Sequence, residues 1–131
     1  MIKLNETYPN IQFLVCTVPL TGVKKGPEAI LKDILGRARV DALENVKRLK
    51  FNRYFKRDFD DIIPIFDLAS LESTLPDGTI ETFRYKGEKY PCLSKAYRSD
   101  YGHLNDFGAK TVSYNLLAFL AEEVYIDEIS N

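Results

Sequence analysis

The sequence is poor in the residues that build disulfide frameworks and metal sites. Its 131 residues include no tryptophan, one histidine and two cysteines. Cys16 and Cys92 are far apart and show no C-x-x-C spacing, and their neighbours are apolar or strand-like. We expect both to be buried thiols, with a disulfide or a reactive cysteine as the alternative. One histidine without clustered carboxylates cannot complete a metal shell, so neither a metal nor another cofactor is predicted.

Long apolar runs and an excess of charge are also missing. No stretch approaches the roughly 20 apolar residues that a helix needs to span a bilayer. The first ten residues lack the basic and apolar regions of an export signal. The sequence therefore leaves the cellular compartment undetermined. The chain as given would be cytoplasmic, and it would be exported if an upstream segment carries a signal. With 18 basic and 19 acidic side chains the formal net charge is −1, so no nucleic-acid partner is expected.

What is present is the composition of one ordinary folded domain. Hydrophobic residues make up 45% and charged residues 28% of the chain, which is typical of soluble globular proteins. No internal repeat or Gly/Ser-rich linker interrupts it, so residues 1–131 are predicted to form a single domain.

The first half of the sequence predicts parallel strands joined by helices. Residues 11–18 are a continuous apolar run, typical of a strand buried on both faces. A helix is expected from Pro27 to about Leu35, and a longer one from Arg39 to about Phe59. Residues 62–68 form the second strand candidate, in which Pro64 favours an edge position or a bulge. The order strand, helix, strand implies a right-handed crossover and parallel pairing.

The second half predicts a hairpin and a final helix. Pro76-Asp77-Gly78 is a turn signal, and two short strand-like runs flank Lys86-Gly87. We expect this hairpin to be a surface insertion. A helix should begin after Asn105, a good N-cap, and run to about Val124. The complete order indicates an α/β fold.

The helix expected over residues 39–59 contains the strongest cluster of basic residues in the sequence. Its basic residues are Lys47, Arg48, Lys50, Arg53, Lys56 and Arg57. A nucleic-acid interface would need the neighbouring aromatic rings to be exposed. Their spacing of three and four places these rings on a buried apolar stripe: Phe51, Tyr54, Phe55 and Phe59. The cluster is therefore predicted to be a solvated helix face.

The single histidine, His103, is the first candidate for chemistry. Asp100 precedes it by three residues, a separation that lets a carboxylate fold back onto the imidazole within one tight turn. Such a carboxylate fixes the imidazole tautomer and stabilises the imidazolium that forms when the ring accepts a proton. Because the chain has ten aspartates, the D-x-x-H pattern is weak by itself, and a lone histidine is more often a surface or capping residue.

The context of this pair resembles a known family. Asp100, His103-Leu104-Asn105 and Gly108, followed by an amphipathic helix, resemble the last conserved block of the SGNH-type hydrolases, the GDSL-like esterases and lipases. The resemblance implies that His103 is the general base of a Ser-His-Asp triad and that Asp100 orients it. The implied activity is hydrolysis of small acyl or acetyl esters.

The resemblance extends over nearly the whole chain. Tyr8-Pro9 and the apolar run after it are similar to one family strand, the helix with Asn52 to the next helix, and the strand ending at Asp67 to the strand before the histidine loop. The chain thus resembles the C-terminal half of such a domain. The fold implied is a partial three-layer α/β/α arrangement of the flavodoxin-like type, with parallel strands, a hairpin insertion and a C-terminal helix.

Three family blocks have no counterpart in this sequence. The Gly-Asp-Ser block with the nucleophile is absent, as are the glycine and the Gly-x-Asn-Asp block that supply oxyanion donors. Ser94 and Ser99 are too close to His103 along the chain to replace the nucleophile, and Cys16 falls within a strand. We therefore expect a catalytically incomplete hydrolase, inactive alone, whose substrate-binding residues remain unassigned.

A different hypothesis is a non-catalytic α/β interaction module. A core of two parallel strands would leave unpaired backbone groups along an open edge. The sequence then predicts a partner at that edge, which is either a second copy of the chain or the missing N-terminal half.

Overall fold

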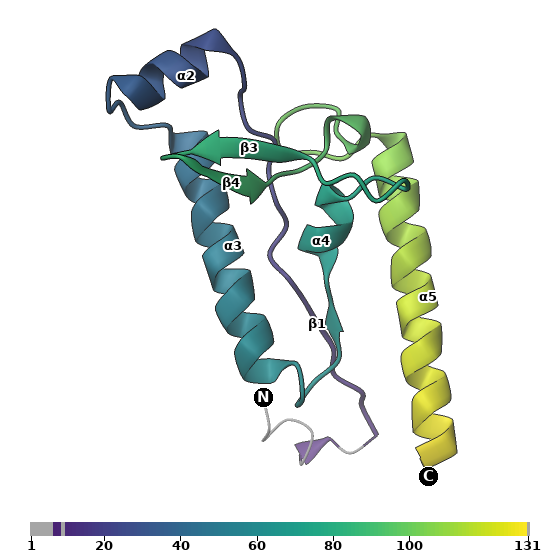
Figure 1. Cartoon of the computed structure of the whole chain (residues 1–131). Helices are drawn as coiled ribbons and strands as arrows, with labels where there is room; N and C mark the ends of the chain where they lie inside the picture. The colour runs from purple at the N-terminus through teal and green to yellow at the C-terminus, as the bar shows by residue number, and fades with distance from the viewer. Residues whose placement is uncertain (1–6, 9, 131) are drawn as a thin grey trace.

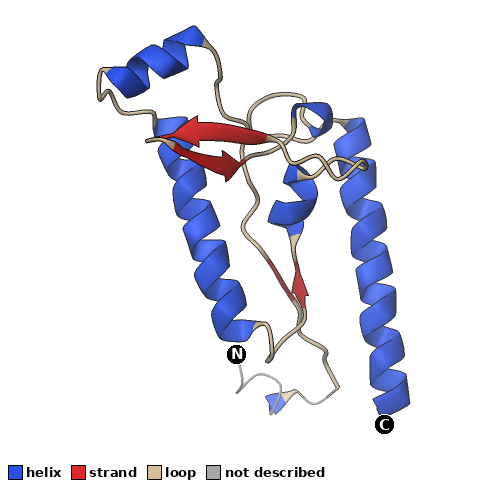
Figure 2. Cartoon of the chain, in the orientation of Figure 1, coloured by secondary structure: helices blue, strands red, loops and turns tan. Residues whose placement is uncertain are grey.

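The computed structural model describes residues 7–8 and 10–130, which form helices and two small sheets (Figures 1 and 2). The main elements follow one another as β1 (Val15–Cys16), α2 (Pro27–Ile34), α3 (Val40–Phe59), β2 (Ile65–Phe66), α4 (Leu68–Ser73), β3 (Thr82–Tyr85), β4 (Glu88–Pro91), the 3₁₀ helix η1 (Lys95–Tyr97) and α5 (Asp106–Ser130). This combination agrees with the predicted α/β class. Among the described residues, no helix is both long and apolar enough to cross a membrane.

The two predicted strands pair in parallel, as expected. Val15 lies opposite Ile65 in the register. The Val15 N–H donates to the Pro64 carbonyl at 3.0 Å and the Thr17 N–H donates to the Phe66 carbonyl at 3.1 Å. Pro64 thus contributes its carbonyl immediately before β2, where its missing N–H costs no ladder bond.

The ladder is shorter than the predicted strands over 11–18 and 62–68. On the β2 side the reason is Asp67, whose carboxylate accepts the Ser70 N–H at 3.3 Å and caps α4. A capping carboxylate directly after the strand turns the chain into a helix at Leu68. The sequence analysis missed this short helix because its six residues carry too little periodicity.

Helices α3 and α5 lie on opposite sides of the β1–β2 pair (Figure 1). On one side, Asn52 of α3 hydrogen-bonds the backbone of Val18, just beyond β1. On the other, the ring of Phe119 in α5 packs against Phe66 of β2 with their centroids 5.5 Å apart. Neither strand has a further strand beside it in the described chain.

The buried face of α3 corrects the predicted aromatic stripe. The helix buries Ala42, Asn45, Val46 and Asn52. Phe51 and Tyr54 are 54% and 56% exposed, because the helical rotation turns them away from the face on which Asn52 lies. Phe55 and Phe59 are half-buried, so the predicted burial of the aromatic stripe was wrong for Phe51 and Tyr54, which lie exposed beside the basic residues of this helix.

The extended segment between β1 and α2 is held by side chains instead of a neighbouring strand. The carboxamide of Asn52 accepts the Val18 N–H and donates to the Val18 carbonyl, both at 2.8 Å. Asn45 pairs in the same way with Thr21, at 2.9 Å in both directions. Seven residues separate the two asparagines, so they lie on one helix face and replace the backbone partners that a strand would supply.

The hairpin forms as predicted but is not a surface insertion. Its turn residues Lys86 and Gly87 have φ angles of 51° and 86°, the left-handed pair that a two-residue type I′ turn requires. Phe83 is 3% exposed and belongs to one core cluster together with Val23, Ala42, Val46 and Cys92. The hairpin therefore closes the core over α3, and a surface role for it was wrong.

The two cysteines differ in environment. Both thiols are free. Cys92 is buried as expected, at 1% exposure. The prediction for Cys16 was wrong, because nothing in the described chain covers its side chain enough to bury it and it is exposed.

Candidate acid–base site

The residues that follow the histidine dock α5 onto the rest of the protein. Asn105 caps the helix as predicted, because its Oδ1 accepts the Gly108 N–H at 2.8 Å. The Asn105 N–H donates to the Tyr97 carbonyl at 2.8 Å and its Nδ2 donates to the Ala96 carbonyl at 2.9 Å. A Cβ on Gly108 would lie 2.3 Å from the Tyr97 carbonyl oxygen, so only glycine allows this approach.

The loop before α5 closes on itself and projects the candidate residues outward. The Ser99 N–H donates to the His103 carbonyl at 3.0 Å, and an antiparallel bridge joins Arg98 to Leu104. Leu104 packs against a buried cluster that includes Leu20. Residues 100–103 therefore form a short protruding turn whose base is anchored in the core.

Within this turn the carboxylate of Asp100 faces the imidazole of His103. The distance from Asp100 Oδ2 to His103 Nδ1 is 2.8 Å, and from Oδ1 to Nδ1 it is 3.1 Å. Asp100 Oδ1 also accepts the backbone N–H groups of Gly102 at 2.7 Å and of His103 at 2.9 Å. The contact expected from the spacing in the sequence is therefore present in the structure.

These donors set the protonation state of the acid. The backbone N–H of Gly102, followed by the side chain and backbone N–H of His103, lowers the pKa of Asp100 to about 2. The carboxylate is thus ionised at neutral pH. With Nδ1–H donating to this anion, the lone pair of the neutral ring lies on Nε2, the arrangement that a general base requires.

The pair is open to solvent on the ring side. The His103 side chain is 80% exposed and that of Asp100 is 59% exposed. No protein group among the described residues hydrogen-bonds Nε2. His103 lines none of the three clefts of about 500, 450 and 300 Å³. The ring is free to accept a proton, and it lies outside these three clefts.

Sequence reasoning missed the residues that position the turn from outside it. The Gly22 N–H donates to the Tyr101 carbonyl at 2.8 Å. The Arg98 guanidinium stacks over the Tyr101 ring at 4.4 Å and packs so closely on Gly22 that a Cβ there would lie 2.2 Å from it. Arg98 Nε is buried and lacks a hydrogen-bond partner within the described chain. Nothing local marks the contacts of Gly22, because they join segments more than 75 residues apart.

The hydroxyls of Ser94 and Ser99 bond to backbone groups and not to the His103 ring. The hydroxyl of Ser99 donates to the carbonyls of His103 and Leu104, at 3.3 and 3.4 Å. Ser94 is fully buried and its hydroxyl accepts the Ala96 N–H at 3.2 Å. Although the Cys16 side chain is exposed, partial desolvation raises the pKa of its thiol; the Leu68 N–H lowers it by less, and Glu72 and Asp67 raise it, so the thiolate is disfavoured. The structure therefore brings together an acid and a base and no nucleophile among the three residues considered.

Comparisons with protein-family models, curated proteins and solved structures gave no match to this chain. The described residues also contain no group of three or more histidine, cysteine or acidic side chains placed to hold a metal ion. The chemistry of the site thus has to be argued from the Asp100–His103 pair itself.

Proposed function

We propose that this chain supplies the general base and the orienting acid of an SGNH-type ester hydrolase, acting with a nucleophile and oxyanion donors from sequence outside these 131 residues. The observation that carries the proposal is the 2.8 Å contact between Asp100 Oδ2 and His103 Nδ1, with Nε2 left free. An ionised carboxylate on Nδ1 directs the lone pair to Nε2 and stabilises the imidazolium formed in the reaction.

The surroundings of the pair support a catalytic role over a structural one. Leu104, Asn105 and Gly108 pack, cap and dock the neighbouring helix. The His103 ring does none of these, and an ion pair so exposed adds little to stability. The fold needs the turn made by the Asp100 carboxylate, but it does not need an imidazole at position 103.

The proposed mechanism is acyl transfer. A serine hydroxyl from the other part of the site attacks the ester carbonyl, and His103 Nε2 takes its proton. His103 then returns the proton to the departing alcohol, leaving an acyl-enzyme that water hydrolyses. Oxyanion donors would also come from the other part. We also propose that the other part completes a three-layer α/β/α fold of the flavodoxin-like type and adds a further parallel strand beside β1.

The free edge of β1 presents the backbone groups with which such a strand would pair. Val15 and Thr17 direct their N–H groups to β2. Backbone groups alternate along a strand, so the N–H and carbonyl of Cys16 point to the opposite edge. The same edge favours the second candidate function, a non-catalytic module that associates with a second copy of itself through β1.

The test has two stages, and the first uses the chain alone. Ring ¹⁵N shifts of neutral His103 are expected to show a protonated Nδ1, and Asp100→Asn to alter the tautomer balance. A protonated Nε2 in the wild-type chain would contradict the proposed base. Light scattering addresses the second candidate, because a stable symmetric dimer would favour self-association through β1 and a folded monomer would disfavour it.

The second stage tests catalysis. The DNA preceding the Met1 codon is translated in frame, and a segment encoding Gly-Asp-Ser and Gly-x-Asn-Asp is joined to the chain. We expect hydrolysis of p-nitrophenyl acetate by the joined protein only, and a loss of roughly ten-thousand-fold or more in His103→Ala. Ser99→Ala is the matched control in the same turn and should retain the rate. Hydrolysis that survives His103→Ala would refute the proposal.

A further inference from the structure

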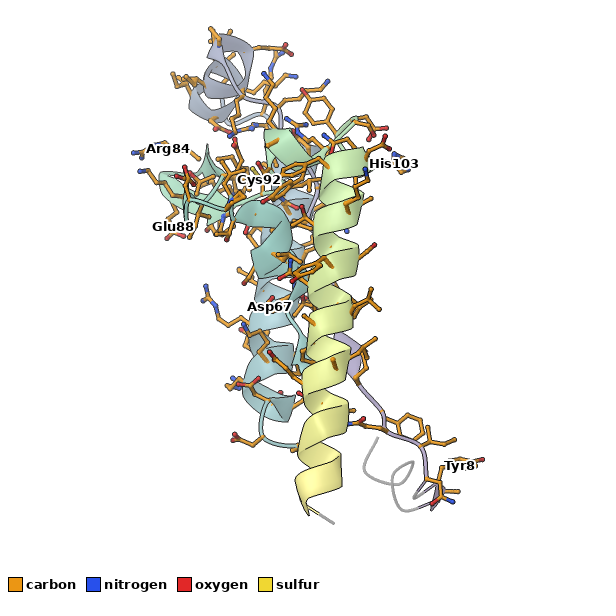
Figure 3. All side chains as sticks on the ribbon, turned by 90° about the vertical axis from the view of Figure 1, so that its right-hand side faces the viewer. Tyr8, Asp67, Arg84, Glu88, Cys92 and His103 are labelled. Carbon is orange, nitrogen blue, oxygen red and sulfur yellow. The ribbon has the colours of Figure 1, made fainter. Side chains whose placement is uncertain are left out.

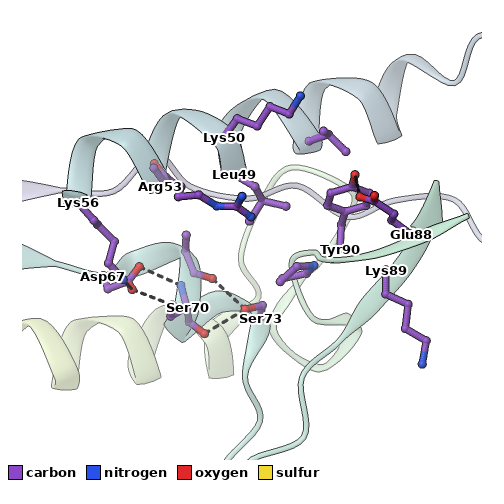
Figure 4. A pocket seen from close by; sticks show the side chains of 14 residues that line it. Leu49, Lys50, Arg53, Lys56, Asp67, Ser70, Ser73, Glu88, Lys89 and Tyr90 are labelled. Atoms are coloured by element: carbon purple, nitrogen blue, oxygen red, sulfur yellow. Dashed lines mark hydrogen bonds and ion pairs between the residues drawn. The ribbon is translucent and has the colours of Figure 1, made fainter. Parts of the chain in front are cut away.

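A cleft unrelated to His103 lies between α3, α4 and the β3–β4 hairpin (Figure 4). Its volume is about 500 Å³, within the range of sites that hold small organic molecules. Figure 3 shows Glu88, which lines the cleft, on the opposite side of the molecule from His103. The cleft is therefore separate from the acid–base site.

One part of the cleft wall is apolar, and contacts within the hairpin hold its aromatic ring in place. Val46, Leu49, Ala69 and Pro91 contribute aliphatic surface. Tyr90 adds an aromatic ring, which packs against Phe83 at a centroid distance of 5.8 Å. The Tyr90 hydroxyl donates to Glu88 Oε2 at 2.5 Å, so the ring is held at both ends.

The basic side chains of α3 divide into those with a partner in the protein and those without one in the described chain. Four of the six basic side chains in the cluster have acceptors, in the pairs Lys47–Glu44, Arg48–Pro19 carbonyl, Lys56–Asp67 and Arg57–Asp58. Lys50 and Arg53 have no ion pair or hydrogen-bond acceptor in the described part of the chain, and both line the cleft. They are three residues apart and so share one helix face.

The acids of the cleft do not neutralise these cations. Four basic and two acidic side chains line it, an excess of two positive charges. Asp67 is engaged by Lys56 Nζ at 2.5 Å, and Glu88 accepts the Tyr90 hydroxyl. In Figure 4, Arg53 points toward the middle of the cleft, while Lys50 and Lys89 lie at its rim.

We propose that this cleft binds a small organic phosphate. The guanidinium of Arg53 would pair with the phosphate oxygens, because its planar fork matches their geometry, and Lys50 would add charge from the rim. The apolar part of the ligand would lie against Leu49 and Tyr90. A phosphate dianion balances the two excess charges, and an aryl or short aliphatic group fills the apolar part. This site is independent of the proposed ester hydrolysis.

The test is a titration of the full ¹⁵N-labelled chain with phenyl phosphate, followed by amide shifts. Shifts are expected at Arg53, Ala69 and Tyr90 and not at His103. Arg53→Gln and Lys50→Gln should each raise Kd by at least about fivefold, and added salt should weaken binding. Lys47→Gln is the matched control, because it removes a charge from the same helix outside the cleft.

Two results would overturn the proposal. One is equal weakening by Lys47→Gln and Arg53→Gln, which would show that only the general charge of α3 matters. The other is the same affinity for inorganic phosphate as for phenyl phosphate, which would show that the apolar wall takes no part. The three cations are exposed, so the variants should keep the wild-type circular dichroism spectrum, which verifies that lost binding is not lost folding.

Discussion

Replacing either buried asparagine of α3 should destabilise the protein far more than its size suggests. In Asn52→Ala, the N–H and carbonyl of Val18 lose partners that now lie at 2.8 Å. Leaving a buried polar group unpaired costs about 1–3 kcal/mol. Val18 is only partly buried, so water can reach part of the vacated space. We therefore expect a loss of roughly 2–4 kcal/mol in the free energy of unfolding.

Asn45→Ala should cost a similar amount. Asn45 is 0% exposed, and its carboxamide makes two backbone hydrogen bonds with Thr21 and accepts a third from the Thr21 hydroxyl at 3.2 Å. The Thr21 carbonyl keeps the Leu93 N–H at 3.1 Å, so the backbone group left unpaired is the Thr21 N–H, and we expect a loss of roughly 2–4 kcal/mol. Domains of this kind are usually stable by about 5–15 kcal/mol, so both variants should still fold.

The assay is urea unfolding followed by circular dichroism, with stability taken from the midpoint at an unchanged slope. Asn52→Leu separates hydrogen bonding from packing, because leucine has the same number and branching of side-chain heavy atoms but cannot hydrogen-bond Val18. It should be about as unstable as Asn52→Ala. Asn115→Ala is the control, since Asn115 is exposed and donates only to Thr111 one turn earlier in its own helix. An Asn52→Leu variant as stable as the wild type would refute the proposed role of the carboxamide.

Two further predictions concern the site and its support. Gly108→Ala places a Cβ 2.3 Å from the Tyr97 carbonyl oxygen, so the start of α5 must shift. Thermal unfolding should show a loss of about 1–3 kcal/mol in the free energy of unfolding. An unchanged melting temperature would contradict the close approach. Burial raises the pKa of Glu72 above its usual value of 4.5, so the stability contributed by its protonated form is present below that value and is lost as the pH rises through the folded-state pKa. Glu72 now accepts the Leu20 N–H at 2.8 Å, and Glu72→Gln keeps an acceptor there. This variant should be more stable than the wild type at neutral pH but not below pH 4.5. An identical pH dependence of the two urea midpoints would rule this out.

The acid–base pair was predictable because it depends on local chain geometry. Asp100 and His103 are three residues apart, and a tight turn between them suffices to join carboxylate and ring. What the sequence did not reveal is how the turn is held. The contacts of Gly22 with Tyr101 and Arg98 cross more than 75 residues, and no periodicity or spacing in the sequence reports them.

The errors in the predicted core have one physical origin. Helical spacing groups apolar residues without saying which side the rest of the protein covers, so Phe51 and Tyr54 were assigned to the wrong face of α3. The buried face instead carries two asparagines, which satisfy an extended segment that lacks a neighbouring strand. Likewise, whether Cys16 is buried depends on what packs against its face of β1, which its apolar neighbours in the sequence cannot report.

Features that arise from bonds within a few residues could be predicted from the sequence. These are the turn at Lys86-Gly87, the cap at Asn105, the helices that start near Pro27 and Asp106, and the Asp100–His103 pair. Packing between distant segments sets which helix face is buried, which cations have no partner in the cleft, and on which side His103 is exposed. Local conformations follow from steric and hydrogen-bonding preferences of neighbouring residues, whereas burial and charge sorting follow from how distant segments pack.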